Sequence, residues 1–376
     1  MKTALKILLF IFLICRINIS AQEIPFDVIL KKARLEIYDN PDNSIATAKS
    51  LLKKEKNIDK VIQIYIVLST ANIAKRDFDQ SLQYILKAKE LAQKSNDLKT
   101  QTSVLISVAI QYQQMELFSK SFETLNEADL YLAKLPDDLF EKHIETARSY
   151  AIRGMIYKSQ SNSEIALEKF LISIKNFEKV NPKQSAYANM SVVYYNIGYC
   201  YLNLNQIDKA QEAFLQSVTY AQKNNAKSLE AFALKGMAEV YKQKRENKAA
   251  LHLLIKAEDL CKNTQDLILN EGIYKEMADN YLAMGNQSLY QDYNKKHFEM
   301  RFKRQQNELK SINQAINNHN KETLKKSEEL KTYYFRIKML VIAFGTIIIS
   351  VLFYFILKVK KQNRKYQKEI QELIRS

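Results

Sequence analysis

The side chains in this sequence that could ligate a metal or attack a substrate are few and scattered. The four histidines are His143, His252, His297 and His319. None has a second histidine or a cysteine at metal-ligand spacing, so each is interpreted as an ordinary helix residue. Cys200 and Cys261, the cysteines beyond residue 21, form no C-x-x-C pair; two small core residues are favoured over a disulfide.

Motifs for covalent or phosphoryl-transfer chemistry are also missing from the printed sequence. It contains no Gly-rich phosphate loop and no G-x-S-x-G nucleophile turn. The carboxylate pair Glu328-Glu329 falls in a highly charged stretch, where solvated side chains are expected. We therefore expect no catalytic residues, no metal, no cofactor and no enzyme activity.

The composition favours a fold made of helices. Of 376 residues, 47% are hydrophobic, which is enough for a large core, while only 6 are glycine and 4 are proline. Sheets and their hairpins usually require many Gly, Pro and Asn-Gly turns. The prediction is an all-α chain with short turns.

The net charge of +16 is concentrated beside apolar segments. Residues 1–21 carry +3, residues 331–338 carry +3 and residues 358–376 carry +5, which leaves only +5 over residues 22–330. Membrane topology explains such a distribution, whereas a nucleic-acid surface would require basic residues along the folded part. No nucleic-acid partner is expected for this chain.

The first 21 residues have the layout of a secretory signal peptide. A basic start precedes an apolar stretch from Ile7 to Cys15, and Ala21 is a small residue at a plausible cleavage position. The apolar stretch is too short for a permanent membrane helix, although an uncleaved anchor is the alternative. The mature protein would begin near Gln22, outside the cytoplasm.

A second apolar segment, Met339 to Leu357, predicts a transmembrane helix. It has no charge and contains 13 Leu, Ile, Val or Phe residues, which together favour insertion by about 4–8 kcal/mol. At about 1.5 Å per residue it spans roughly 28 Å, close to a hydrocarbon core of about 30 Å. The basic segment 358–376 follows, so the positive-inside rule places it in the cytoplasm. The prediction is a single-pass protein of the inner membrane with residues 22–338 in the periplasm.

A repeated pattern fills the region between these segments. The unit YYNIGYCYLNLNQIDKAQEAFLQSV, from Tyr194 to Val218, places small residues at Gly198 and Ala210 and large ones at Tyr201 and Phe214. Small residues permit two helices to cross closely, and large ones fill the gap to the next pair. The position of Ala210 recurs at Ser81, Ser121, Ala166, Ala210 and Ala250, in steps of 40, 45, 44 and 40 residues.

These units resemble tetratricopeptide repeats, with steps longer than the usual 34 residues. The resemblance implies an α-solenoid at residues 22–295, with about five clear repeats and two divergent ones at residues 24–54 and 274–300. It also implies a concave groove that binds a protein or peptide. By the family pattern the groove-facing positions are Arg148, Met155, Lys158, Tyr195, Asn196, Tyr199, Asn203 and Lys242.

Residues 296–338 turn polar and are expected to form a helical stalk. Phe302, Leu309, Ile312 and Ile316 lie near heptad positions, but asparagines interrupt the pattern, so a weak coiled coil and a plain solvated helix both fit. A coiled coil here would join two copies into a homodimer. The segment 358–376 is expected to form a basic juxtamembrane helix.

The order of segments resembles that of membrane-anchored sensor regulators of Gram-negative bacteria. In those proteins a periplasmic tetratricopeptide array is usually linked to a histidine kinase or a DNA-binding domain, which is absent from the printed sequence. The leading hypothesis is a membrane-anchored protein-interaction module that acts as the receptor part of a signal-transduction system. The alternative is a structural scaffold of the cell envelope with an inert anchor.

Overall fold

The structure, a computed structural model, describes residues 25–375 except 96, 181–182, 263 and 265. In this part of the chain every regular element is a helix and no strand occurs. The predicted all-α class is confirmed, and so is the predicted helical-repeat solenoid followed by a long helix. The predicted signal peptide, residues 1–21, lies outside the described residues.

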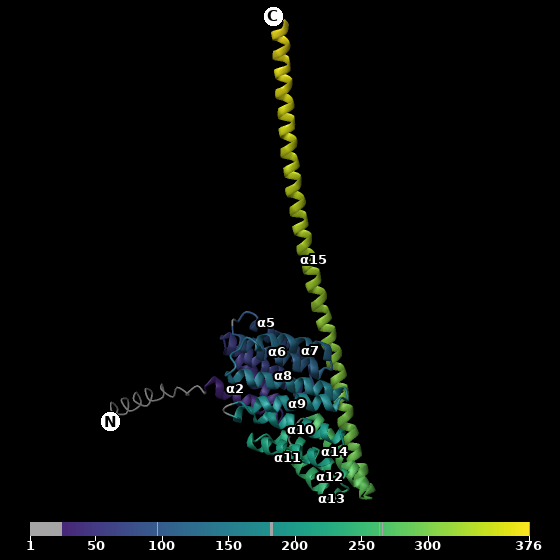
Figure 1. Ribbon diagram of the computed structural model, residues 1–376. Coiled ribbons are helices and arrows are strands. Elements are labelled where there is room, and N and C mark those ends of the chain that lie inside the picture. The colour runs from purple at the N-terminus through teal and green to yellow at the C-terminus, as the bar shows by residue number, and fades with distance from the viewer. Residues whose placement is uncertain (1–24, 96, 181–182, 263, 265, 376) are drawn as a thin grey trace, which may run out of the picture. The chain divides into compact units, whose positions relative to one another are not determined.

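The helices follow one another as antiparallel pairs that stack along the array (Figure 1). Two of the pairs contain the predicted divergent units, and the other five contain the clear ones. The helices are α2 (Phe26–Leu35) and α3 (Pro41–Lys54); α4 (Ile58–Ala74) and α5 (Phe78–Ala92); α6 (Leu98–Gln114) and α7 (Phe118–Leu132); α8 (Phe140–Ser159) and α9 (Ser163–Phe177); the 3₁₀ turn η1 (Lys183–Ala186); α10 (Tyr187–Asn203) and α11 (Ile207–Lys223); α12 (Lys227–Gln243) and α13 (Asn247–Cys261); and α14 (Leu267–Ala283) and α15 (Gln287–Arg375).

The turns inside the pairs from α4–α5 to α14–α15 repeat one backbone geometry. A residue with positive φ ends the first helix, and the next residue donates its N–H to a carbonyl five residues back, as in Gln206 to Tyr201 at 2.8 Å. This is the Schellman arrangement, which satisfies the last carbonyls of a helix. The same bond occurs in the turns at Arg76, Glu116, Ser161, Asn205, Arg245 and Gly285. Only the last of these residues is a glycine, so the short fixed turn, and not glycine itself, sets the geometry.

The predicted small residues lie where the two helices of a pair cross. Ser81, Ser121, Ala166, Ala210 and Ala250 are each 0% exposed. A side chain in place of Gly198 would collide with the buried ring of Phe214, because an added Cβ would lie 2.6 Å from its Cε1. At Ser121 the hydroxyl also donates to the carbonyl of Ala109 at 2.8 Å. Close helix crossing therefore explains the residue types in the repeat.

The start of α15 belongs to the same compact unit as the array, which ends at Ala315. Tyr293 of α15 stacks on Tyr281 of α14 with ring centroids 5.5 Å apart. Further along, Ala315 is buried in a core cluster with Ile62 and Phe78 of the second pair. The unit boundary at 315 lies 20 residues beyond the expected array end at 295, so the first part of the expected stalk packs on the array.

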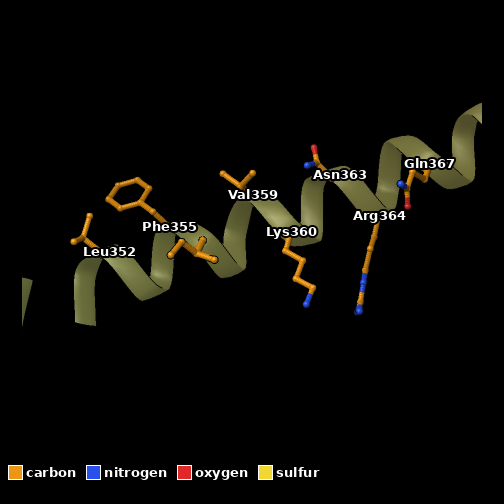
Figure 2. A pocket seen from close by; sticks show the side chains of 8 residues that line it. Leu352, Phe355, Val359, Lys360, Asn363, Arg364 and Gln367 are labelled. Carbon is orange, nitrogen blue, oxygen red and sulfur yellow. The ribbon is translucent and has the colours of Figure 1, made fainter. Parts of the chain in front are cut away.

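The second unit, Ile316–Ser376, consists in its described part of the rest of α15. It includes a window long and apolar enough to cross a membrane, and none of that window is buried. Figure 2 shows where the apolar part ends: Leu352, Phe355 and Val359 give way along the helix to Lys360 and Arg364. The residues drawn there come from one helix and enclose no cavity.

Candidate functional site

Three cavities lie on the inner side of the array, lined mainly by the first helix of each pair. The first has a volume of about 700 Å³, the second about 360 Å³ and the third about 250 Å³. Ser107, Arg148 and Asn189 line both the first and the second cavity. Phe232 and Ile268 line both the second and the third. The three therefore form a continuous series, which we call the inner channel.

The first cavity combines apolar walls with polar groups. Ile62, Ile66 and Ile144 supply aliphatic surface. Glu141 lines the same space, and its Oε2 is buried without a hydrogen-bond partner among the described residues. A buried carboxylate oxygen without a partner is unfavourable by about 1–3 kcal/mol, which a ligand N–H could offset.

Two arginines give the first cavity a positive side. Arg148 is held by Glu145, with Nη1 2.7 Å from Oε2, whereas Arg34 donates to the neutral amide of Gln63 at 3.3 Å. Water reaches the Arg34 side chain, yet surrounding protein desolvates it and lowers its pKa; the charge of Asp27 opposes this shift, and that of Arg148 adds to it. Both guanidiniums stay charged, because they titrate far above neutral pH. This side of the cavity suits a carboxylate, which guanidinium binds in a bidentate way.

The second cavity lies where the two ends of the array approach each other. Tyr38, in the turn between α2 and α3, lines it together with Asp266, the N-cap of α14. Tyr38 is 43% exposed, yet the surrounding protein partly desolvates its phenol and raises its pKa, and the charge of Asp266 raises it further. Nearby, Ser228 of α12 donates to Asp39 at 2.8 Å. The superhelix therefore turns far enough for its first pair to contact its sixth, which encloses the channel.

The third cavity is bounded by α14 and the start of α15. Arg304 donates to Glu271 from Nε at 2.5 Å and from Nη2 at 3.1 Å, and both residues line the cavity. His297 is 8% exposed, with Nδ1 3.3 Å from the carbonyl oxygen of Glu271. These contacts fix α15 against the wall of the channel.

The groove residues predicted from the family pattern divide into two groups. Arg148 lines the first two cavities and Tyr195 lines the third. The other six, Met155, Lys158, Asn196, Tyr199, Asn203 and Lys242, are not among the lining residues of these cavities. Their contacts connect neighbouring helix pairs, and their role toward a partner stays a prediction.

The connecting contacts form a ladder along the inner helices. The Nζ of Lys158 donates to Asn196 at 2.5 Å, and Asn203 donates to Ser163 at 3.2 Å. Lys242 of α12 forms a salt bridge with Glu276 of α14, the first helix of the next pair. Desolvation lowers the pKa of Lys158. Its Nζ lies over the Tyr199 ring, 5.5 Å from the ring centroid. Met155 packs at the edge of the α8–α10 core.

Tyr199 lies at the centre of a buried polar cluster. It donates its hydroxyl proton to Glu239 and accepts a hydrogen bond from Lys235 at 2.5 Å. Burial raises the pKa of Tyr199 well above its usual range, so the phenol stays protonated. Lys235 also pairs with Glu239 at 2.9 Å and lines the third cavity. The cluster reaches the channel through Lys235.

Several channel residues were not expected from the sequence. Arg34, Tyr38 and Asp266 lie outside the clear repeats or at their edges, and Arg304 lies in the expected stalk. The repeat pattern gives no signal for them, because they reach the channel through the closure of the superhelix. The described residues contain no cluster of three or more His, Cys, Asp or Glu side chains suited to a metal.

Comparison with known proteins agrees with this geometry. A family model described as tetratricopeptide repeat matches residues 192–224, which cover the end of α10, the turn and α11. The chain contains a tetratricopeptide repeat. This match falls on the unit whose spacing is clearest in the sequence, and the helix pairs on both sides repeat its packing. No curated protein sequence matches the chain.

Solved structures resemble the helical-repeat array in fold. NprR in complex with its cognate peptide NprX is 15% identical, with a TM-score of 0.52 over 78% of this chain and 83% of that one. A Rap protein complexed with competence and sporulation factor is 13% identical, with a TM-score of 0.49 over 81% and 98%. BtubC from P. vanneervenii is 13% identical, with a TM-score of 0.48 over 61% and 91%. At this identity the likeness to NprR shows a shared helical-repeat fold.

Proposed function

We propose that this protein is a membrane-anchored peptide receptor whose ligand binds in the inner channel. The observation that carries the proposal is the first cavity, which presents three features together: apolar surface, the Arg34 guanidinium, which forms no salt bridge with a described residue, and the Glu141 Oε2, which has no hydrogen-bond partner among the described residues. A peptide offers the complementary groups: aliphatic side chains, a carboxylate and backbone N–H donors. The likeness in fold to NprR, solved with a bound peptide, supports a peptide over a small metabolite.

The continuity of the channel supports an extended ligand. The first cavity alone, at about 700 Å³, falls in the range of about 300–1,000 Å³ typical of small-ligand sites. The second and third cavities continue from it through shared lining residues. A peptide of several residues can follow such a path, with an acidic side chain at Arg34, aliphatic side chains along Ile66 and Phe232, and its C-terminal carboxylate in the second cavity.

The membrane segment supports the receptor part of the proposal. We infer that the apolar window of α15 forms one crossing and, from the positive-inside rule, that the basic residues 358–376 are cytoplasmic. On this topology the array faces the periplasm. Periplasmic peptides would then be sensed by the channel, and the signal would be transmitted by α15.

Binding can be tested with the full-length protein in lipid nanodiscs and a synthetic pool of hexapeptides with free C-termini. We expect saturable binding that Arg34→Met weakens about tenfold, which corresponds to the loss of one charge-assisted hydrogen-bonded contact of about 1.5 kcal/mol. Lys31→Met removes a charge from the exposed face of the same helix and serves as the matched control. Equal binding by the wild type and the Arg34 variant would show that the first cavity is not the site.

The receptor role can be separated from that of an inert scaffold by deleting residues 362–376. A receptor should keep peptide binding and lose its downstream response, measured as the change in transcript levels when the peptide pool is added to cells. A scaffold with an inert anchor should be unaffected by the deletion. An unchanged response in the deletion strain would exclude signalling through this segment.

A further inference from the structure

The residues that hold α15 against the second helix pair also line the inner channel. Glu308 of α15 accepts from Arg76 Nε at 2.6 Å and from Arg304 Nη1 at 2.8 Å. Arg304 in turn pairs with Glu271 of α14. The resulting chain of four charges connects the last helix pair with the turn between α4 and α5. Arg76 lines the second cavity, and Arg304 and Glu271 line the third.

Besides this ion-pair chain, α15 contacts the second pair through Ser311, Ile312 and Ala315. The hydroxyl of Ser311 accepts the backbone N–H of Asp79 at 2.9 Å, near the start of α5. Ala315 is 1% exposed in the core cluster there, with Ile312 packed beside it. The next apolar side chains of the helix on either side, Leu309 and Ile316, are exposed. Arg76 and Glu308 form the charged part of this contact.

We infer that a peptide carboxylate in the channel competes with Glu308 for Arg76 and thereby releases α15 from the second helix pair. The inference rests on the proposed function and assigns a regulatory step to the same site. The exchange replaces one carboxylate by another, so Arg76 is never left as an unpaired charge in a partly buried place. Glu308 moves into water, where its own charge is well solvated. Such a like-for-like exchange needs little free energy, so a ligand of moderate affinity can shift the balance between the two states.

The released helix is the one that continues, without a break, through the apolar window to Arg375. Release therefore detaches from the array the part of α15 that precedes the membrane crossing. Ligand binding at Arg76 and the position of α15 are coupled in both directions: a chain with a detached helix binds the carboxylate more tightly.

The test uses spin labels at Lys87→Cys on α5 and Asn313→Cys on α15, both exposed positions, in the full-length chain carrying Cys15→Ser in nanodiscs. Double electron–electron resonance then reports the distance between the two helices. The probes are a pool of hexapeptides with free C-termini and the same pool with C-terminal amides. We expect the free-acid pool to add a population at longer distance and the amide pool to leave the distribution unchanged.

Two variants test whether the contact between Arg76 and Glu308 can open or is permanent. Glu308→Gln is expected to show the longer distance without peptide and to bind the free-acid pool about tenfold more tightly, because the fraction of open chains no longer limits the apparent affinity. Glu299→Gln, at an exposed position of the same helix, is the matched control and should behave as the wild type. A Glu308→Gln chain with the wild-type distances would overturn the inference.

The outcomes also distinguish this inference from the proposed function. Binding of the free-acid pool with an unchanged distance in the wild type would leave the peptide receptor intact and refute the release of α15. Absence of binding by either pool would refute the peptide receptor, and the competition at Arg76 with it.

Discussion

The ring of Phe214 occupies the place where a side chain of Gly236 would lie. A Cβ added to Gly236 would be 2.2 Å from Cε1 of the ring, which is 0% exposed and cannot move aside because Tyr195 and Tyr199 pack edge-on against it. Overpacking of this kind costs about 1–3 kcal/mol. The gain in helix propensity from Gly to Ala is only about 0.5–1 kcal/mol. Gly236→Ala should therefore lower the free energy of unfolding, measured by urea denaturation.

Gly272→Ala is the matched control for this prediction. An added Cβ there would meet the Cδ of Lys235 at 3.1 Å, part of a flexible side chain and not a buried ring. The stability of this variant should remain close to that of the wild type or rise slightly. If both variants unfold at the same urea concentration, the Phe214 ring is not the tight point of the α10–α12 packing.

The ion pair between Lys235 and Glu239 should be necessary for the stability of the array, because a buried charge needs a partner. Their side chains are 11% and 20% exposed. Replacing only Glu239 by Leu leaves a lysine charge with few partners, which should destabilise the array by about 3 kcal/mol. The double variant Lys235→Met/Glu239→Leu removes both charges and should recover most of the loss. Urea unfolding of the three chains measures the difference, and equal losses in the single and double variants would contradict it.

The pH dependence of this pair follows from its pKa. Desolvation lowers the pKa of Lys235, but Tyr195 and Glu239 raise it more, so the folded-state value lies above the unfolded one. A lysine of this kind contributes its stability at all pH values below its unfolded pKa, and the contribution is lost only as the pH rises through the folded value. The wild-type advantage over the double variant should therefore be constant from pH 6 to pH 9.

Much of the fold can be read from the sequence because the repeat encodes local geometry. The residue at Ala210 and its equivalents must be small wherever two adjacent helices cross, so their spacing alone locates the helix pairs. Tyr201 and its equivalents supply the carbonyl that closes the turn. Both requirements act within about 25 residues, which is why a pattern of residue types reveals them.

Fewer of the channel residues could be predicted from the sequence. Arg148 and Tyr195 belong to clear repeats and were identified as inward-facing, but Arg76 and Asp266 meet only because the superhelix curves back on itself. The curvature depends on small rotations between successive pairs, which residue types do not specify. The family pattern also does not distinguish a groove residue from one that bridges two helix pairs. Lys158 is at a groove position by that pattern, yet its ammonium donates a hydrogen bond to Asn196 of the next pair.

The two described cysteines should react slowly with thiol reagents. Burial raises the pKa of Cys200 to about 11 and that of Cys261 to about 12, and both are at most 1% exposed. Because the thiolate is the reacting form, their labelling at pH 8 should be slower than that of an exposed thiol by a factor on the order of a hundred or more. Labelling of a Cys15→Ser chain with a chromogenic disulfide should show two thiols after unfolding. Fast labelling in the folded chain would contradict the buried positions, and absence of thiols after unfolding would reveal a disulfide.

The apolar window of α15 should anchor the protein in the membrane, and two arginines should abolish the anchor. Ile348 and Leu352 lie one turn apart in the middle of the window, and both are exposed in the described helix. Each arginine at the centre of a membrane helix opposes insertion by about 2.5–3.5 kcal/mol, so the pair opposes it by about 5–7 kcal/mol, close to the whole gain from the window. Ile348→Arg/Leu352→Arg should therefore release the protein from membranes at alkaline pH, measured by carbonate extraction. The matched control, Phe302→Arg/Leu309→Arg, changes two exposed residues of the same helix before the window and should leave the protein in the membrane pellet. Retention of the first variant in the pellet would assign the anchor to another part of the chain.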